Sequence, residues 1–411
     1  MPHLNPRPAQ LGVAVLHVTL ILVLLASLGV FYAARGGITE QRISANEVRS
    51  QAAYQAALAG LDHAMGYFDA GQKVEEFAPG TGATAPQTSL LRGANYRVQF
   101  CSPAATPPTC AATVTPALAC TPPASAELRS PMVVACGWSN DSTTVVRMVQ
   151  LVAGAPVLSG SITTPIVTFG SNNMLTGGGS VLNYFNDLTV WSGGAVPTQS
   201  ATGKTFVRNI VSDPVPLATA DYRNAGTSPS CNNPPNHYVC SSSGTNVGPD
   251  VIANDTALST LTASQFFATF MGSAPADYRA SKVTYTVDGS KAASATNATS
   301  VGSIPTDKLY NQVIWIEGNV SSQIPDLGTA TAPVIVIING NWDVTGSPVI
   351  NGLVVVTGNV SGNGSPTIYG ALIANQVTIN GNFKVVFDPT GLGLTQRLGR
   401  AGTVPGSFRD W

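Results

Sequence analysis

The N-terminal part of the chain carries two hydrophobic patterns in succession. Residues 13–34 are uncharged apart from any proton on His17, and this run of 22 exceeds the roughly 20 residues that a helix needs to cross a bilayer. Residues 38–68 are amphipathic instead, with small or apolar side chains at i, i+3, i+4 spacing. We therefore predict one continuous helix, on the order of 80 Å long at about 1.5 Å per residue. The side chains predicted to form its packed face are Ala53, Ala56, Ala57, Gly60, Leu61, Ala64 and Met65.

A cleaved signal peptide is the alternative for the apolar run. Such a peptide has an apolar core of about 7 to 15 residues followed by a site of small residues, and "ASLGVFYAARGG" at 26–37 imitates that site. The run is longer than such a core, however, and helix-favouring residues continue in phase beyond it. Gly36 and Gly37 weaken the junction by about 1 kcal/mol each without forbidding a continuous helix. We predict a retained helix, with a plain signal anchor and helical stalk as the second interpretation.

Three short runs after the helix predict a small antiparallel sheet within residues 69–153. They are "ANYRVQFC" (94–101), "PMVVACGWS" (131–139) and "TTVVRMVQLVA" (143–153), and the "NDS" turn between the last two indicates a hairpin. Strand alternation places Tyr96, Val98 and Phe100 on one face, against the helix, and leaves Arg97 and Gln99 on the other.

An internal repeat occupies the C-terminal third. "GSPVINGLVVVTGNVSGN" begins at Gly346 and "GSPTIYGALIANQVTING" begins at Gly364, with Ser, Pro, Ile and Gly in register. Residues 334–345 and 313–322 resemble further turns of the same kind. Repeats of roughly 20 residues, each too small to bury its own apolar strand, indicate a stacked parallel β-solenoid over 311–389, which residues 383–389 would close. An ordinary β-sandwich with coincidental spacing is the alternative.

Residues 154–310 are rich in Ser, Thr, Gly and Asn and are expected to form irregular early coils. Residues 258–272 are the exception, because a Thr or Ser cap precedes a helical apolar phase. The predicted fold class is therefore α+β: a long N-terminal helix, a small antiparallel sheet and a parallel β-solenoid, followed by a tail over 390–411.

The composition argues against classes of function that depend on a strong net charge. Charged residues make up 10% of the chain, and 20 basic residues nearly balance 21 acidic ones, so no overall field favours nucleic acid or anionic lipid. The local enrichment of Arg397, Arg400 and Arg409 is better explained as a solvated tail.

Six cysteines, all after the apolar run, favour three disulfides in an oxidising compartment. The short loop from Cys231 to Cys240 is the pairing expected first, although His237 inside it leaves a metal site as an alternative without an evident fourth ligand. Cys101 and Cys136 fall on neighbouring predicted strands and are paired here, which leaves Cys110 with Cys120. Six cysteines allow fifteen pairings, so the sequence does not fix this connectivity.

The sequence contains few residues that could act in catalysis. The four histidines are His3, His17, His63 and His237, which gives a Ser or Cys nucleophile almost no eligible base. The carboxylates of the repeat region are scattered and have no partner one coil away, so neither an enzyme nor a cofactor is predicted. They are Glu317, Asp326, Asp343 and Asp388.

Residues 10–68 resemble the type IV pilins, and more closely the PilX-like minor pilins. The resemblance implies a leader of residues 1–12, cleavage by a prepilin peptidase between Gly12 and Val13, and a helix that packs in the filament core through His17, Leu20, Leu24 and Leu28. Major pilins carry Glu five residues after the cut, where this chain has His17, and this departure suits a subunit at or near the tip. The tail "PGSFRDW" is similar to the "PGSWRDW" of PilX-like proteins, and we expect it to return to the head sheet.

The resemblance implies a non-catalytic subunit of a type IV pilus that helps to initiate assembly and presents an adhesive or partner-binding surface. The expected partners are major and minor pilins and a large tip adhesin, and the expected location is the inner membrane, N-terminus in the cytoplasm, and then the pilus. Trp315, Trp342 and Tyr369 are the candidate partner surface, with core packing as their alternative role. A surface β-helix module independent of pili is the second hypothesis, and a polysaccharide-active β-helix enzyme the third.

Overall fold

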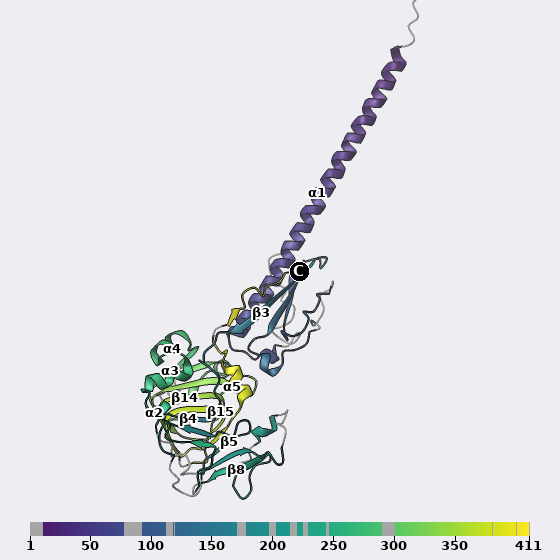
Figure 1. Ribbon diagram of the computed structural model, residues 1–411. Coiled ribbons are helices and arrows are strands. Elements are labelled where there is room, and N and C mark those ends of the chain that lie inside the picture. Colours follow the sequence, from purple (N-terminus) through teal and green to yellow (C-terminus); the bar gives the residue numbers. More distant parts are fainter. Residues whose placement is uncertain are drawn as a thin grey trace, which may run out of the picture.

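The computed structural model consists of a long helix, a small sheet on the end of that helix, and a larger β-rich body beyond it (Figure 1). It describes residues 11–77, 93–111, 118, 120–170, 178–196, 203–213, 220–224, 229–243, 246–289, 301–379, 381–399 and 401–410. Residues 1–10 of the predicted leader, and Arg400, lie outside this described part. We call residues 69–153 the head and residues 154–389 the β region.

Helix α1 runs without interruption from Leu11 to Asp69, a length of 59 residues or about 89 Å at 1.5 Å per residue. Figure 1 shows its N-terminal half projecting away from the rest of the protein. Gly36 and Gly37 do not break it, because a glycine weakens a helix without blocking its hydrogen bonds.

The head is an antiparallel sheet with the strand order β1-β2-β3-β17. Tyr96, Val98 and Phe100 of β1 are buried against the Ala-rich face of α1, as the alternation predicted. The β2–β3 hairpin turns through Asn140 and Ser142. The elements are β1 (Asn95–Cys101), β2 (Met132–Trp138), β3 (Val145–Gly154) and β17 (Ala401–Thr403), with 3-10 turns at Val74–Glu76 and Ser125–Glu127.

The C-terminal tail lies along the edge of β3. Ala401 pairs with Gly154, and Arg409 bridges to Val149 further along the same strand. The backbone N–H of Gly399 donates to the carbonyl of Ala155 at 3.0 Å, so the chain leaves the head and returns to it at adjacent positions. Along the sequence, the β region is therefore an insertion between β3 and β17, which are neighbouring strands of the head sheet.

The β region is built on a 13-stranded mixed sheet among the described residues. Its main path is β10-β11-β12-β14-β15-β16-β5-β7-β8, parallel except for the antiparallel β7–β8 pair. The first strands are β4 (Ile166–Thr168), β5 (Ser180–Asn183), β6 (Val190–Ser192), β7 (Lys204–Arg208), β8 (Tyr238–Ser243), β9 (Val251–Ile252) and β10 (Tyr285–Asp288). The later strands are β11 (Val313–Glu317), β12 (Val334–Asn339), β13 (Trp342–Val344), β14 (Val349–Gly362), β15 (Thr367–Ile379) and β16 (Lys384–Val386).

The predicted repeat is visible in the strand register. Val334 of β12 pairs with Gly352 of β14, and Val349 of β14 pairs with Thr367 of β15, so each partner lies one repeat further along the chain. The prediction that residues 383–389 close the stack is wrong, because β16 pairs with β5 as well as β15 and the sheet continues to β8. The described residues show a mixed sheet and no closed solenoid.

The central strands are buried on both faces. Val334, Val336 and Ile338 of β12 point into one hydrophobic core, while Ile335 and Ile337 point into a second core beneath the helices. Such double burial is typical of parallel sheets and produces continuous apolar runs. The covering helices are α2 (Thr256–Ser259), α3 (Ala263–Met271), α4 (Pro275–Ser281) and α5 (Pro389–Thr395), and short 3-10 turns lie at Ala220–Arg223, Val301–Ser303 and Thr306–Lys308.

Two of the three predicted disulfide pairings are wrong. Cys101 pairs with Cys120 and Cys110 with Cys136, whereas Cys231 pairs with Cys240 as expected. The β1–β2 register places Cys101 opposite Met132, four residues along β2 from Cys136. That offset is about 13 Å at 3.3 Å per residue, beyond the roughly 7 Å between Cα atoms that a disulfide can bridge.

Candidate functional site

The N-terminal half of α1 is an apolar rod that the rest of the protein leaves uncovered. Its large apolar side chains from Val15 to Tyr32 are 47–73% exposed. It is the one described helix whose length and apolar character would allow it to cross a membrane. Because so much contiguous apolar surface is unfavourable in water, the rod indicates anchoring in a membrane.

The residues predicted to pack in a filament lie on this rod. Leu20, Leu24 and Leu28 follow one another at i, i+4 spacing and therefore form a single stripe, and they are exposed together with His17. Gly12 lies in the first turn of α1 with Val13, and the side chain of Val13 lies outside the described part. Their roles in processing and packing stay predictions.

Small residues allow the second half of α1 to lie directly against the head sheet. A side-chain carbon added at Gly137 of β2 would be 2.1 Å from the backbone oxygen of Ala53 and 2.4 Å from the backbone nitrogen of Ala57. One added at Gly60 of α1 would be 3.0 Å from the ring of Tyr96. The Ala and Gly face of the helix is therefore needed for backbone-to-backbone contact with β2.

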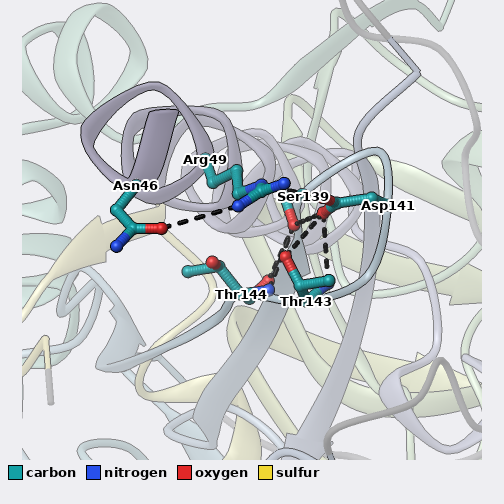
Figure 2. A network of polar contacts seen from close by, with 6 residues as sticks. All are labelled: Asn46, Arg49, Ser139, Asp141, Thr143 and Thr144. Carbon is teal, nitrogen blue, oxygen red and sulfur yellow. Dashed lines mark hydrogen bonds and ion pairs between the residues drawn. The ribbon is translucent and has the colours of Figure 1, made fainter. Parts of the chain in front are cut away.

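A polar network joins the middle of α1 to the β2–β3 turn (Figure 2). Arg49 Nε lies 2.7 Å from Asp141 Oδ2. The other oxygen, Oδ1, accepts hydrogen bonds from the Ser139 hydroxyl at 2.7 Å and the Thr143 hydroxyl at 2.8 Å. The Thr143 backbone N–H donates to the same oxygen at 3.2 Å, so one carboxylate holds both the turn and the helix.

This geometry predicts a pH-dependent contribution of Asp141 to stability. Hydrogen bonds from Ser139 and then Thr143, with a smaller contribution from Arg49, hold the pKa of the Asp141 carboxyl well below its usual range. A depressed carboxyl pKa stabilises the fold at pH values above the unfolded pKa of about 3.9, and this stabilisation is lost as the pH falls through the folded pKa. We expect an NMR titration to find Ser139→Ala raising this pKa more than Arg49→Gln does. Ser50→Ala, at an exposed position on the side of α1 away from Asp141, should leave this pKa unchanged. A larger effect of Arg49→Gln than of Ser139→Ala would contradict the assignment.

The β region is seated on the C-terminal end of α1. Asn311 Nδ2 donates to the carbonyl of Gly71 at 3.1 Å, and Gln312 Nε2 donates to the carbonyl of Ala70 at 3.4 Å. The Lys73 ammonium lies 4.6 Å from the centre of the Tyr310 ring. These two hydrogen bonds satisfy backbone carbonyls in the turn that directly follows α1.

Arg129 joins α1, the head and the returning chain. It is 4% exposed, its Nε and Nη2 each donate to the carbonyl of Arg397 at 3.2 Å, and its guanidinium lies 4.4 Å from the centre of the Phe68 ring. Burial lowers the pKa of Arg129 to about 10 and Asp69 partly offsets this effect, so the group remains charged at neutral pH. This role of Arg129 cannot be predicted from the sequence, because a single Arg in a loop carries no local signal of burial.

The prediction that Trp315 and Trp342 form a partner-binding surface is wrong. Trp315 and Trp342 are each 1% exposed, the first under the covering helices and the second in the interior of the β region. Tyr369 is half-buried, with the Arg223 guanidinium 4.4 Å from its ring centre. The two tryptophans therefore fill the core instead of forming a surface.

A recurring three-residue motif in the sequence, from which its burial could have been predicted, explains the position of Trp342. The motif Gly-Asn-apolar recurs, and its third residue is buried every time: Val320, Trp342, Val360 and Phe383. The Asn side chains form a ladder, with Asn319 Oδ1 accepting the backbone N–H of Asn341 and Asn341 Oδ1 accepting that of Asn359, both at 2.8 Å. Trp342 occupies the inward position of this motif.

Three of the four carboxylates named from the sequence of the β region, Glu317, Asp326 and Asp388, have structural partners. Asp388 is buried, caps α5 and accepts a hydrogen bond from the Tyr222 hydroxyl at 2.9 Å. Glu317 accepts from Trp315 Nε1 at 2.8 Å and pairs with Arg279 at 2.7 Å. Asp326 Oδ1 accepts the Val349 backbone N–H, and Asp343 of β13 lies opposite Ser361 of β14.

No group of His, Cys, Asp or Glu in the described part could hold a metal ion. The alternative metal site in the short cysteine loop is wrong, because Cys231 and Cys240 are joined in a disulfide and present no thiolate. His237 Nδ1 instead lies 2.6 Å from Asp213 Oδ2.

A comparison with known protein families agrees with the arrangement of the helix and head. Residues 12–62 match the family described as PilX N-terminal. Together with a rod-like helix packed on an antiparallel sheet, this match supports a type IV pilin-like protein. No curated protein matches the chain. Among solved structures, the competence-associated pilin ComZ from Thermus thermophilus is 12% identical, with a TM-score of 0.26 and coverage of 88% of this chain and 97% of that one.

Proposed function

We propose that this protein is a non-catalytic minor pilin of a type IV pilus. The observation that carries the proposal is α1, an uninterrupted helix whose first half is apolar and uncovered and whose second half packs through small residues on an antiparallel sheet. Such a helix provides both a membrane anchor before assembly and a packing surface after it. The PilX N-terminal match begins at Gly12, the proposed last residue of the leader.

We propose the following division of the chain. Residues 1–12 are the leader, 13–68 the assembly helix, 69–153 the head, 154–310 the irregular part of the β region and 311–389 its repeats, with the tail 390–411 returning to the head. We interpret the repeats as an open parallel solenoid. The repeat register and the Asn ladder support this interpretation, because both require equivalent positions of successive coils to stack.

The proposed site of action is the pilus tip, reached from the inner membrane with the N-terminus in the cytoplasm. His17 stands where major pilins carry the Glu that pairs with the N-terminal amine of a neighbour, which disfavours ordinary positions along the filament. The protein would initiate assembly with other minor pilins, contact major pilins through Leu20, Leu24 and Leu28, and present the β region to a partner such as a large tip adhesin.

Processing tests this proposal. Mass spectrometry of protein from sheared filaments is expected to find Val13 at the N-terminus. Gly12→Val should abolish cleavage and remove the protein from the filaments, because the peptidase reads the last leader residue. Gly160→Val is the matched control, since Gly160 is exposed in the β region, outside the assembly helix, and a side-chain carbon there meets nothing within 4 Å. A mature N-terminus beyond Ala34 would remove the assembly helix and overturn the proposal.

A surface-anchored β module independent of pili is the second candidate, favoured by the size of the β region. It predicts surface display in cells that lack the pilus assembly motor, whereas a minor pilin stays in the membrane of those cells. The third candidate, a polysaccharide-active enzyme, finds little support in the described part, because Glu317 and Asp388 are held by structural partners.

A further inference from the structure

One strip of the parallel stack carries only polar side chains on its outer side. It consists of four adjacent rungs, each with a buried apolar residue between two outward polar ones. The rungs are aligned, because Val320 pairs with Trp342, Trp342 with Val360, and Val360 with Val377. We call this strip the polar face, and its eight side chains are Asn319, Ser321, Asn341, Asp343, Asn359, Ser361, Gln376 and Thr378.

The polar face differs from the other outer surfaces of the stack. The outer side chains of β11 and β12 lie beneath α3 and α4, where Phe267 and Tyr278 cover them. The outer side chains of β16 and β5 lie against Tyr222 and Tyr238. On the polar face, by contrast, the first three rungs are exposed and the fourth is half-buried.

The chemistry of the polar face is neutral and rich in hydrogen-bonding groups. Asp343 is its only ionisable side chain, and the face has no Lys or Arg. The ladder uses the Oδ1 atoms of Asn319 and Asn341, and each amide keeps its two N–H donors directed away from that bond. The other column alternates hydroxyl groups with the Asp343 carboxylate, so donors and acceptors repeat at the strand spacing of about 4.8 Å.

A groove continues the polar face around the next corner of the stack. Its volume is about 470 Å³, and two successive repeats line it with the same kinds of groups. Its polar side chains are Asp343, Thr345, Ser347, Asn363 and Ser365. The volume lies within the range of about 300–1,000 Å³ that is typical of small-ligand sites.

We propose that the polar face and its groove bind an extended chain of an uncharged polysaccharide. Sugar hydroxyls both donate and accept hydrogen bonds, and an extended glycan repeats at a spacing close to that of the rungs. A polyanion would meet Asp343 without a compensating cation, and a protein partner would find no apolar side chain to bury at the centre of the face. This inference deepens the proposed function by naming the ligand class of the presented surface.

Binding of neutral oligosaccharides to the full-length protein in detergent tests the inference. The probes are β-1,4-linked hexasaccharides of glucose, N-acetylglucosamine and mannose, measured by isothermal titration calorimetry. Saturable binding of at least one is expected, and Ser321→Arg and Ser361→Arg should each weaken it at least about tenfold by placing a long side chain across the rungs and displacing hydrogen bonds. The matched control is Ser264→Arg, an exposed position on α3, which should leave the affinity unchanged.

The outcome of this binding experiment can be distinguished from the outcome of the processing test of the proposed function. Failure of all three probes, or preferential binding of a DNA oligonucleotide or heparin, would overturn the polysaccharide inference while leaving Val13 processing and filament location to be judged by themselves. Equal weakening by Ser264→Arg would also overturn it, since the effect would then not depend on the polar face. Circular dichroism of each variant shows whether the β region remains folded.

Discussion

Replacing Trp342 with alanine is expected to lower the free energy of unfolding of the β region by about 3–5 kcal/mol. The indole is 1% exposed and lies between Val320 and Val360 of the adjacent rungs, so its removal leaves a cavity that these shorter side chains cannot fill. Urea unfolding of the full-length protein in detergent, followed by far-UV circular dichroism, measures the change.

Truncation of an exposed aromatic side chain provides the comparison for Trp342→Ala. Phe408 in the tail is 41% exposed, and Phe408→Ala should change the free energy of unfolding by less than about 0.5 kcal/mol. Equal effects of the two substitutions would show that Trp342 does not fill the interior of the stack.

Gly137→Ala is expected to destabilise the contact between α1 and the head by about 2–3 kcal/mol. The added carbon would lie 2.1 Å from the Ala53 backbone oxygen, and backbone atoms of a packed helix cannot rotate out of the way. The helix must therefore shift away from β2 and expose Ala57 and Leu61. Limited proteolysis within residues 38–69, together with urea unfolding, reports this shift.

The same substitution at Gly66 is the matched control. Gly66 is exposed on α1, and a side-chain carbon there meets nothing within 4 Å. Because alanine favours the helix over glycine, Gly66→Ala should stabilise the protein by up to about 1 kcal/mol. A destabilisation of similar size at both positions would contradict direct backbone contact at Gly137.

Features that depend on local periodicity were accessible from the sequence. The apolar run and the Ala face of residues 53–64 specify the long helix, because helical spacing alone determines which side chains share a face. The β1 alternation of Tyr96, Val98 and Phe100 worked for the same reason, with a period of two. The internal repeat predicted the parallel register of β14 and β15, since equal repeats stack at equal positions.

Features that depend on long-range register were not accessible. The pairing of Cys101 with Cys120 follows from a β1–β2 offset that neither strand encodes by itself. Arg129 is buried only because the chain returns to the head at Arg397, 268 residues later. Contacts between such distant segments leave no periodic trace in a single sequence.

The burial of the central strands on both faces could be predicted from the sequence only in part. The runs "VIWI" and "VIVII" contain no alternation, and this absence is itself the mark of strands covered on both faces. Trp315 belongs to the first of these runs, and its core-packing alternative is the role that the structure confirms. The covering helix α3 was expected from its own phase, but its position over β11 required the structure.

Because the chain leaves the head at Gly154 and returns to it at the paired residue Ala401, the number of repeats in the β region does not change the distance between these two ends. Duplicating or deleting one repeat unit would lengthen or shorten the body by a single strand spacing, about 4.8 Å, while the anchor and its docking sheet keep their places. Under the proposed function, the distance to which the β region extends from the pilus would therefore change in steps of one strand spacing, without any change in the assembly helix.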